Sequence, residues 1–436
     1  MAANVEVISK LERRMTVTVP MKPIEDEIHQ RIQQLTRTAK LPGFRPGKVP
    51  LKIVEQQYGA QVRDEALASA IERTFGESVD QNKLRVAGFP NIEHKPFNEA
   101  DGKFEYVATF EVFPDVEMGD IEKLKIERPV LELKAADIDK TIEVLQKQRG
   151  TYAPVKRAAK LTDKVTLSLS ASMDGKEVES TGEQTIDLVL GEGGRVPEFD
   201  ENLVGVQAAA EKSFKIKYKK DHQVEELAGK TVTYDVKVKE VAELQLPKVD
   251  ADFAKALGVE DGDVKKMKEE IKASLQQEVD RRVRARLKDQ VFNALVENAK
   301  FELPKALLQS ETQRLLQIAA QNLQRRGVDP STVNLEPSVF EPQAKQTVTL
   351  RLVLSELVHK NSLHAKPEQI KAMVETFAQG YQDPAEVLTW YYADPKRLEE
   401  PTALATEENV VSWVLESAKV TDQKVDFDEF MRGPNA

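Results

Sequence analysis

The decapeptide LPGFRPGKVP at residues 41–50 separates two segments of regular pattern. Its three prolines and two glycines exclude a helix interior and make a central strand unfavourable, because proline lacks a backbone N–H and glycine adds backbone freedom. Gly43 and Gly47 can adopt backbone angles that other residues resist, and the proline after Arg45 biases that residue toward an extended conformation. The sequence therefore predicts a stiff loop that projects Phe44 and Arg45.

The same region is a concentrated basic patch in a chain whose net charge is −10. Between residues 31 and 52 no acidic residue interrupts the cations, which are Arg31, Arg37, Lys40, Arg45, Lys48 and Lys52. A basic loop with one aromatic is typical of docking on a nucleoprotein, where cations contact phosphate and the aromatic fills a protein pocket. Alternatively, Phe44 folds beneath the loop as an anchor. The residue types alone leave both interpretations open.

The segments around this loop predict an α+β domain over residues 1–116. Strict alternation predicts strands near residues 15–19 and 104–112. Apolar residues at helical spacing predict helices over about residues 24–35 and 67–79.

Residues 117–150 are charged, with a short extended piece and then a helix from about residue 135. Residues 151–245 alternate like antiparallel strands around one short helix, which predicts a compact, mostly β domain. Beyond residue 246 we expect no strand. Apolar residues recur at every fourth position across 264–298, and further helices are expected over 306–326, 339–361, 367–379, 384–392 and 403–419.

The apolar stripe at 264–298 is narrower than the apolar face of a helix in an ordinary core. We therefore expect an elongated all-α C-terminal domain whose helices leave apolar edges accessible. An ordinary helical bundle with a solvated outer face remains the alternative.

The composition excludes several classes of protein. The chain has no cysteine, which excludes disulfides and thiol catalysis, and a net charge of −10 argues against a surface that coats nucleic acid throughout. We find no nucleotide-binding, nucleophile-elbow or zincin motif, and the five histidines have no ligand spacing, so no cofactor and no metal site are expected. Without an apolar leader or a membrane-length apolar run, we expect a soluble cytoplasmic protein.

Residues 43–50, GFRPGKVP, match the GFRxGxxP ribosome-docking signature of bacterial trigger factor, and the chain resembles this family over essentially its whole length. GVEDG at 258–262 and YQDPAEV at 381–387 are also similar to the family. The resemblance implies an α+β ribosome-binding domain, a linker segment that packs with the C-terminal domain, an FKBP-type antiparallel β domain and a helical substrate-cradling domain. Their expected ranges are 1–116, 117–150, 151–245 and 246–436.

The resemblance further implies an ATP-independent chaperone that docks at the ribosomal exit site and shelters newly synthesised polypeptides, keeping them open for folding or export. Its partners would be the large ribosomal subunit, through ribosomal protein and rRNA at the polypeptide exit, and nascent or unfolded chains. No membrane partner is implied, and a homodimer is expected off the ribosome. By position the docking residues are Gly43, Phe44, Arg45, Gly47, Lys48 and Pro50.

For the FKBP-type domain the resemblance implies prolyl cis–trans isomerisation without a covalent step, in an apolar, aromatic-lined pocket. Leu169 and Leu188 stand where the family usually has aromatics, and the loop that normally supplies a tyrosine is shortened, with His222 nearest that place. We therefore expect weak catalysis. The implied pocket residues are Val196, Phe199 and Tyr234, and β-core packing is the alternative for the two aromatics.

Two other functions remain open at this point. One is a free-standing prolyl isomerase whose helical domain recruits substrates. The other is an adaptor that self-assembles through its long helices.

Overall fold

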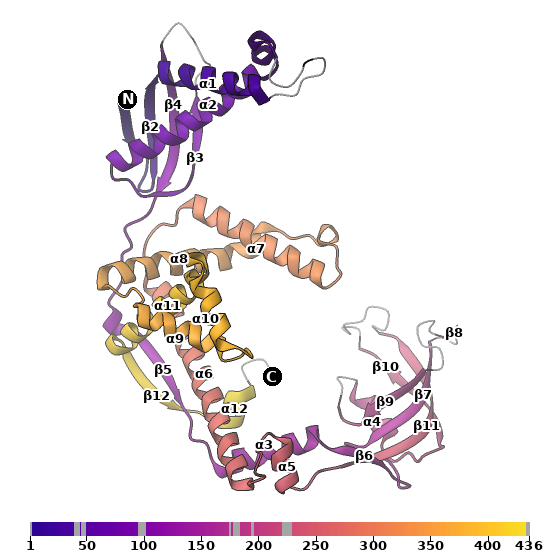
Figure 1. Ribbon diagram of the computed structural model, residues 1–436. Helices are drawn as coiled ribbons and strands as arrows, with labels where there is room; N and C mark the ends of the chain where they lie inside the picture. Colours follow the sequence, from indigo (N-terminus) through magenta and orange to yellow (C-terminus); the bar gives the residue numbers. More distant parts are fainter. Residues whose placement is uncertain are drawn as a thin grey trace. The chain divides into compact units, whose positions relative to one another are not determined.

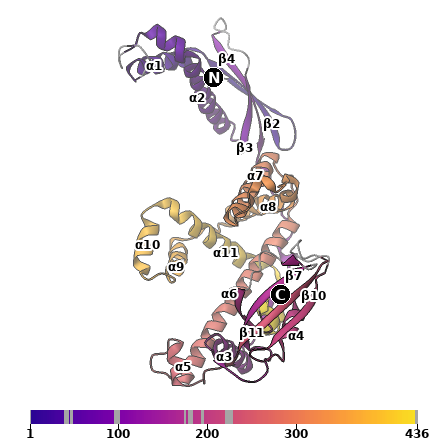
Figure 2. The same ribbon diagram turned by 90° about the vertical axis from the view of Figure 1, so that its right-hand side faces the viewer.

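The computed structural model describes residues 2–38, 44, 49–94, 102–173, 176–177, 184–192, 196–219 and 229–432. The chain folds into two compact units, one comprising Met1–Arg128 and Arg284–Gln423, the other Pro129–Val283 and Lys424–Ala436 (Figures 1 and 2). Each unit therefore combines two stretches that are distant in sequence. The predicted class, a multidomain α+β chain with an antiparallel β domain and a helical C-terminal part, is confirmed.

The N-terminal residues form an antiparallel sheet with the strand order β1-β2-β4-β3, and helices α1 and α2 cover one of its faces (Figure 1). On β2 and β4 every second side chain is buried, which confirms both predicted strands. The helices pack on this apolar face through residues such as Ile24, Ala66 and Ala70. The element bounds are β1 Ala2–Val7, β2 Glu12–Pro20, α1 Lys22–Thr38, α2 Leu51–Gln81, β3 Val86–His94 and β4 Lys103–Val112.

Three features of this region differ from the sequence prediction, and the first is strand β1, which was not predicted. Helix α2 begins at Leu51, directly after Pro50, because Val54 and Val62 pack against Ile32 of α1. Strand β3 was not predicted, since glycine and proline at 88 and 90 resemble a turn. In the structure they form a bulge between Ala87 and Asn91 that interrupts the pairing with β4 without ending it.

The β domain is a sheet with the strand path β10-β11-β7-β8, to which β6 and β9 add at β11 and β7. Short helix α4, Pro197–Leu203, packs into the apolar core through Phe199 and Leu203. The strand bounds are β6 Thr151–Pro154, β7 Lys164–Met173, β8 Lys176–Glu177, β9 Gln184–Val189, β10 Glu211–Lys217 and β11 Thr231–Gln245.

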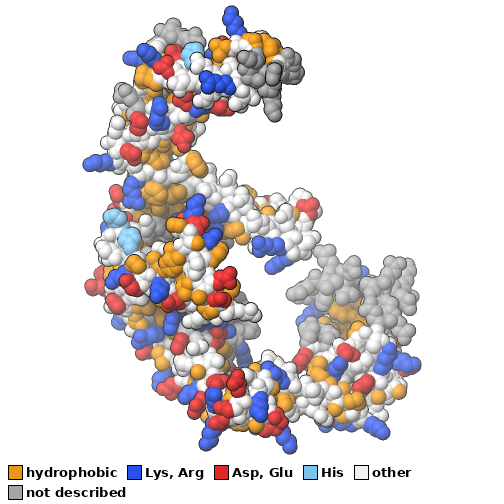
Figure 3. Space-filling view, in the orientation of Figure 1, with side chains coloured by type: hydrophobic (Ala, Val, Ile, Leu, Met, Phe, Trp, Pro, Cys, Tyr) orange, Lys and Arg blue, Asp and Glu red, His pale blue; other side chains and the backbone are white. Residues whose placement is uncertain are grey.

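The C-terminal part is helical, as predicted, and α6 has the predicted bounds Val264–Asn298. On its apolar stripe Leu287, Val291 and Leu295 are buried, whereas Ile271 and Leu275 are only half-buried. Charged side chains of both signs are interspersed over the helical surface in Figure 3. The remaining helices are α5 Ala251–Ala256, α7 Lys305–Arg325, α8 Pro337–Asn361, α9 Pro367–Ala378, α10 Pro384–Tyr392, α11 Glu399–Ser417 and α12 Phe427–Arg432.

The expectation of no strand beyond residue 246 is wrong, because β12, Lys419–Lys424, pairs with β5, Lys125–Val130. Its pattern of exposed polar residues gives no alternation, and its partner comes from the distant segment 117–150. That segment also contributes helix α3, Ala135–Gln148, whose Ile142 packs with Phe253 and Met267. The proposed domain boundaries at 116, 150 and 245 stay predictions.

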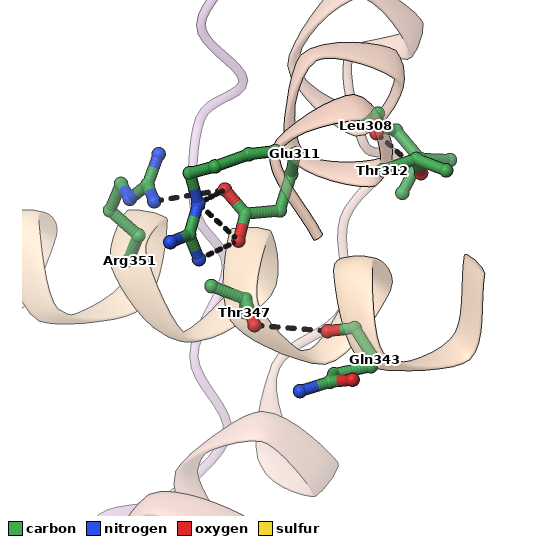
Figure 4. Close-up of polar contacts among 7 residues, drawn as sticks. Leu308, Glu311, Thr312, Gln343, Thr347 and Arg351 are labelled. Atoms are coloured by element: carbon green, nitrogen blue, oxygen red, sulfur yellow. Dashed lines mark hydrogen bonds and ion pairs between the residues drawn. The ribbon is translucent and has the colours of Figure 1, made fainter. Parts of the chain in front are cut away.

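Helices α7 and α8 pack against each other around one buried carboxylate (Figure 4). Glu311 on α7 keeps 3% of its side-chain surface accessible and accepts hydrogen bonds from Arg314 at 2.5 Å and from Arg351 of α8 at 3.3 Å. Both cations lie half in solvent, so they neutralise the carboxylate without being buried themselves. They hold the pKa of Glu311 below its usual range, mainly through the Arg314 hydrogen bond.

Candidate functional site

The loop at residues 41–50 joins α1 to α2. Pro50 is the N-cap residue of α2 and is exposed, with extended backbone angles. Val49 next to it is 6% exposed and packs with Ile32, Val54 and Val62. The apolar anchor of this loop is therefore Val49.

Phe44 keeps 39% of its surface accessible and does not belong to the apolar cluster that holds Val49. The anchor interpretation for Phe44 required burial beneath the loop, so the exposure of this ring argues for the alternative, a ring available to a partner. The other predicted docking residues of the loop, Gly43, Arg45, Gly47 and Lys48, lie outside the described residues.

The basic patch around the loop is weaker than the sequence count indicates. Arg31 forms ion pairs with Glu27 at 2.5 Å and with Glu65 at 3.7 Å. Glu27 lies one helical turn earlier on α1 and Glu65 lies on α2, so neither falls in the sequence window that contains only cations. Arg37 and Lys52 are exposed, and Lys40 lies outside the described residues.

The predicted isomerase residues meet in the core of the β domain. The rings of Phe199 on α4 and Tyr234 on β11 have centroids 5.3 Å apart and lie edge to face at 88°. Val196 is the N-cap residue of α4 and packs, half-buried, on the same cluster. The structure thus brings all three residues together, and His222 lies outside the described residues.

Two aromatic residues that the sequence analysis did not assign complete this cluster. Phe214 on β10 lies 5.4 Å from Phe199 and 5.8 Å from Tyr234, measured between ring centroids. The hydroxyl of Tyr218 lies 2.6 Å from that of Tyr234. The signal was the alternation in FKIKY at 214–218, which directs residues 214, 216 and 218 to one face of the sheet.

The two leucines at the positions where aromatics were expected lie in the same core as these rings. Leu188 is 3% exposed and Leu169 is half-buried, and both pack in the same core. Phe199, Phe214, Tyr218 and Tyr234 are called the aromatic cluster below. Its polar groups are two phenol hydroxyls, and it contains no strong nucleophile.

Burial favours the neutral form of the Tyr234 phenol. Burial, together with the hydrogen bond between its hydroxyl and that of Tyr218, raises the pKa of Tyr234 well above its usual value. The buried Asp200, which follows Phe199 on α4, accepts a hydrogen bond of 2.9 Å from the backbone N–H of Gly191 and so fixes the turn after β9. A neutral, apolar environment suits a substrate imide whose partial double bond must twist.

A second candidate surface lies on the helical part. A cleft of about 660 Å³ is lined by residues 381–383 and by one face of α10, Glu386, Val387, Trp390 and Tyr391. Trp390 and Tyr381 are 52% and 65% exposed. The guanidinium of Arg397 lies 4.1 Å from the centroid of the Trp390 ring and donates a 2.7 Å hydrogen bond to the Trp390 carbonyl, which fixes this indole in place.

Further apolar side chains are exposed near the loop that connects α7 to α8. Val328, Val333 and Val339 are 39%, 38% and 71% exposed. Accessible apolar side chains were predicted for this part of the chain. The exposed valines occur in the same helical part as the buried residues of the α6 stripe.

Within the described ranges, no three His, Cys, Asp or Glu side chains are arranged to hold a metal ion. No helix in the described part of the chain combines the length and hydropathy needed to cross a membrane.

Comparison with known proteins identifies the family. The sequence model described as bacterial trigger factor protein matches residues 1–145, and its C-terminal counterpart matches residues 263–416. A trigger factor from Methylobacillus flagellatus is 58% identical over 431 residues, which cover 99% of both chains. The chain belongs to the trigger factor family.

Other relatives agree with this assignment. A trigger factor from Nitrosospira multiformis is 45% identical and one from Herminiimonas arsenicoxydans is 42% identical, over 99% and 100% of both chains respectively. The FKBP-type peptidyl-prolyl cis–trans isomerase family matches residues 155–239, which include the aromatic cluster. The protein is therefore a chaperone of the trigger factor family with an FKBP-type domain.

Proposed function

We propose that this chaperone docks on the large ribosomal subunit beside the polypeptide exit, through the loop that carries Gly43, Phe44, Arg45, Gly47, Lys48 and Pro50. The exposure of Phe44 is the observation that carries the proposal. Burying an exposed phenylalanine in a pocket of a ribosomal protein stabilises a complex by about 1.5–3 kcal/mol. The burial of Val49 supports it further, because one end of the loop is held in place before binding.

On the ribosome the chain shelters nascent and unfolded polypeptides, and it does so without ATP. The cleft beside Trp390 and the exposed valines around the α7–α8 connection offer separate apolar contacts, each of them small. Spread, weak contacts suit many different clients, because no single sequence is required. The site of action is the cytoplasm, and off the ribosome the chain associates into a homodimer.

The FKBP-type domain catalyses prolyl cis–trans isomerisation in a pocket formed by Val196, Phe199 and Tyr234 together with Phe214. The uncatalysed barrier is about 18–20 kcal/mol, and stabilising the twisted imide in an apolar site lowers it without covalent chemistry. The aromatic cluster supports this assignment.

A second candidate function is that of a prolyl isomerase first, with the helical part recruiting substrates. Four aromatic side chains gathered in the β domain favour it, because that number exceeds what the sequence predicted. Ribosome binding distinguishes the two functions.

The test is cosedimentation of the full-length chain with ribosomes, compared with the variant Phe44→Ala/Arg45→Ala/Lys48→Ala. We expect the variant to remain folded by circular dichroism and to stay in the supernatant. Equal sedimentation of both proteins would exclude docking through this loop and favour the isomerase-first function.

A further inference from the structure

Strand β10 presents a row of lysines to solvent. Phe214 and Ile216 on this strand are buried, and Tyr218 just beyond it is 9% exposed. The lysines that alternate with them, Lys215, Lys217 and Lys219, are exposed. The ladder continues past the strand end, because Gly229 donates its N–H to the carbonyl of Lys219 at 3.0 Å. The three lysines, called the lysine row below, therefore lie on the outer face of the sheet at intervals of about 6.7 Å.

The neighbouring positions on this face carry side chains with hydroxyl groups. Lys215 pairs with Thr233 and Lys217 with Thr231, and Thr233 pairs in turn with Ser172 of β7. Cross-strand partners share a face of the sheet, so threonine and serine side chains lie beside the lysine row.

Most nearby acids of this face are already paired with other lysines. Glu211 contacts Lys237 at 2.8 Å, and Asp187 contacts Lys164 at 2.6 Å. Asp235, which pairs with Ser213 one row away, is the remaining described acid on β10 and β11 beside the lysine row. Within the described residues the lysine row forms no ion pair, although the whole chain is acidic, and the acids that follow it in the sequence, Asp221, Glu225 and Glu226, lie outside the described residues.

Protection of a sheet edge is the simpler explanation for lysines on a strand, and β10 is an edge strand. The same protein does not protect its other sheet in this way. Strands β1 and β3 form the edges of the N-terminal sheet and contain no lysine. The lysine row differs from such an edge, because its three outward lysines continue past the end of β10 at Lys217.

We propose that the lysine row of the FKBP-type domain binds the phosphate backbone of RNA, as a contact separate from the loop at residues 43–50. Lysine ammonium groups repeated along a straight strand match a row of phosphates, and the adjacent hydroxyls can donate hydrogen bonds to phosphate oxygens. No aromatic side chain lies among the outward positions named here, so no base is stacked and binding is independent of sequence.

The test measures binding of a fluorescently labelled poly(U) oligonucleotide to the full-length chain by anisotropy, over a series of salt concentrations. The parent protein carries Phe44→Ala/Arg45→Ala/Lys48→Ala, so that the docking loop does not contribute. The first variant adds Lys215→Glu/Lys217→Glu/Lys219→Glu. The matched control adds Lys272→Glu/Lys300→Glu/Lys345→Glu, three exposed lysines outside the β domain that give the same net charge.

We expect the lysine-row variant to bind roughly tenfold or more weakly at low salt than the matched control. The slope of log affinity against log salt should fall in magnitude by about 2, at −0.7 per phosphate contact. A third variant, with arginine at the three positions, should bind like the parent, because it keeps the charge. All side chains involved point to solvent, so the unfolding midpoint should not change.

Equal loss in the lysine-row variant and the matched control would overturn the proposal, because general charge would then explain the binding. Absence of RNA binding by the parent would overturn it as well. The same assay is also carried out with a labelled poly-Glu peptide in place of the RNA. Tighter binding of that peptide than of RNA, lost in the lysine-row variant, would assign the surface to acidic polypeptides instead. None of these outcomes depends on whether the loop at residues 43–50 docks.

Discussion

The phenol oxygens of Tyr218 and Tyr234 lie 2.6 Å apart, so one hydroxyl donates a hydrogen bond to the other inside the aromatic cluster. Tyr218 follows β10 and Tyr234 lies on β11, so the bond ties the end of one strand to the side chains of the next.

Replacing either tyrosine by phenylalanine should destabilise the β domain by about 1 kcal/mol, because the remaining hydroxyl loses a partner in an apolar environment. The double variant Tyr218→Phe/Tyr234→Phe should cost less than the sum of the two single changes. Hydrogen exchange of the β10 and β11 amides measures the opening free energy of this domain alone. Strict additivity would show that the two hydroxyls do not interact.

The raised pKa of Tyr234 predicts a loss of stability in alkali. The folded state keeps this phenol protonated above about pH 10, where the unfolded chain loses the proton. The contribution is therefore complete below about pH 10 and decreases as the pH rises further. Exchange or circular dichroism across that range should show a smaller loss for Tyr234→Phe than for the wild type, and equal losses would contradict the assignment.

Phe199→Ala should lower kcat/KM for a prolyl peptide by tenfold or more, because it removes the ring that contacts both Phe214 and Tyr234. Leu203→Ala is the matched control, since Leu203 is fully buried on the same helix and is not a member of the aromatic cluster. Both changes cost about 2–5 kcal/mol of stability. A similar loss of activity in both full-length variants would assign Phe199 to core packing only.

Glu311→Gln should destabilise the α7–α8 pair by about 1–3 kcal/mol, because it removes the charge from a buried, hydrogen-bonded carboxylate. In the wild type the lowered pKa of Glu311 makes this stabilisation depend on pH. It is present above about pH 4.3 and is lost as the pH falls further. Glu356→Gln, in an i,i+4 pair with Lys360 on α8, is the control and should cost less than about 0.5 kcal/mol. Hydrogen exchange of the α7 and α8 amides measures both.

Trp390→Ala should weaken the holding of unfolded clients without changing ribosome binding, because it removes the largest apolar side chain of the cleft on α10. Suppression of aggregation of a chemically denatured protein provides the measurement. Val7→Ala is the comparison, since Val7 is exposed in the N-terminal sheet. Unchanged suppression by Trp390→Ala would exclude this cleft as a client surface.

Elements of the fold could be predicted where a local pattern of residues defines them. Helix α6 has its predicted bounds because its every-fourth stripe is a local property of the sequence. Strand β12 was missed because its partner β5 is distant in the sequence, and β3 was missed because Gly88 and Pro90 within it resemble a turn.

The candidate sites, too, could be predicted only in part, because some of their residues are brought together by the fold. Val196, Phe199 and Tyr234 could be named from family resemblance, yet Phe214 and Tyr218 required the register of β10 on β11 to bring them into the cluster. Arg31 looked like part of an uninterrupted basic patch, but it is paired with Glu65 from the next helix. A window of consecutive residues does not contain neighbours that the fold brings in from another helix.

The most direct test of ribosome docking is the dissociation constant for isolated large ribosomal subunits. The full-length wild type is compared with Phe44→Ala/Arg45→Ala/Lys48→Ala and with the control Phe89→Ala, which removes a ring that is 97% exposed in the same N-terminal sheet. We predict that the triple variant loses binding by a hundredfold or more, about 2.7 kcal/mol, while Phe89→Ala binds like the wild type. Binding of the triple variant at wild-type affinity would contradict docking through this loop.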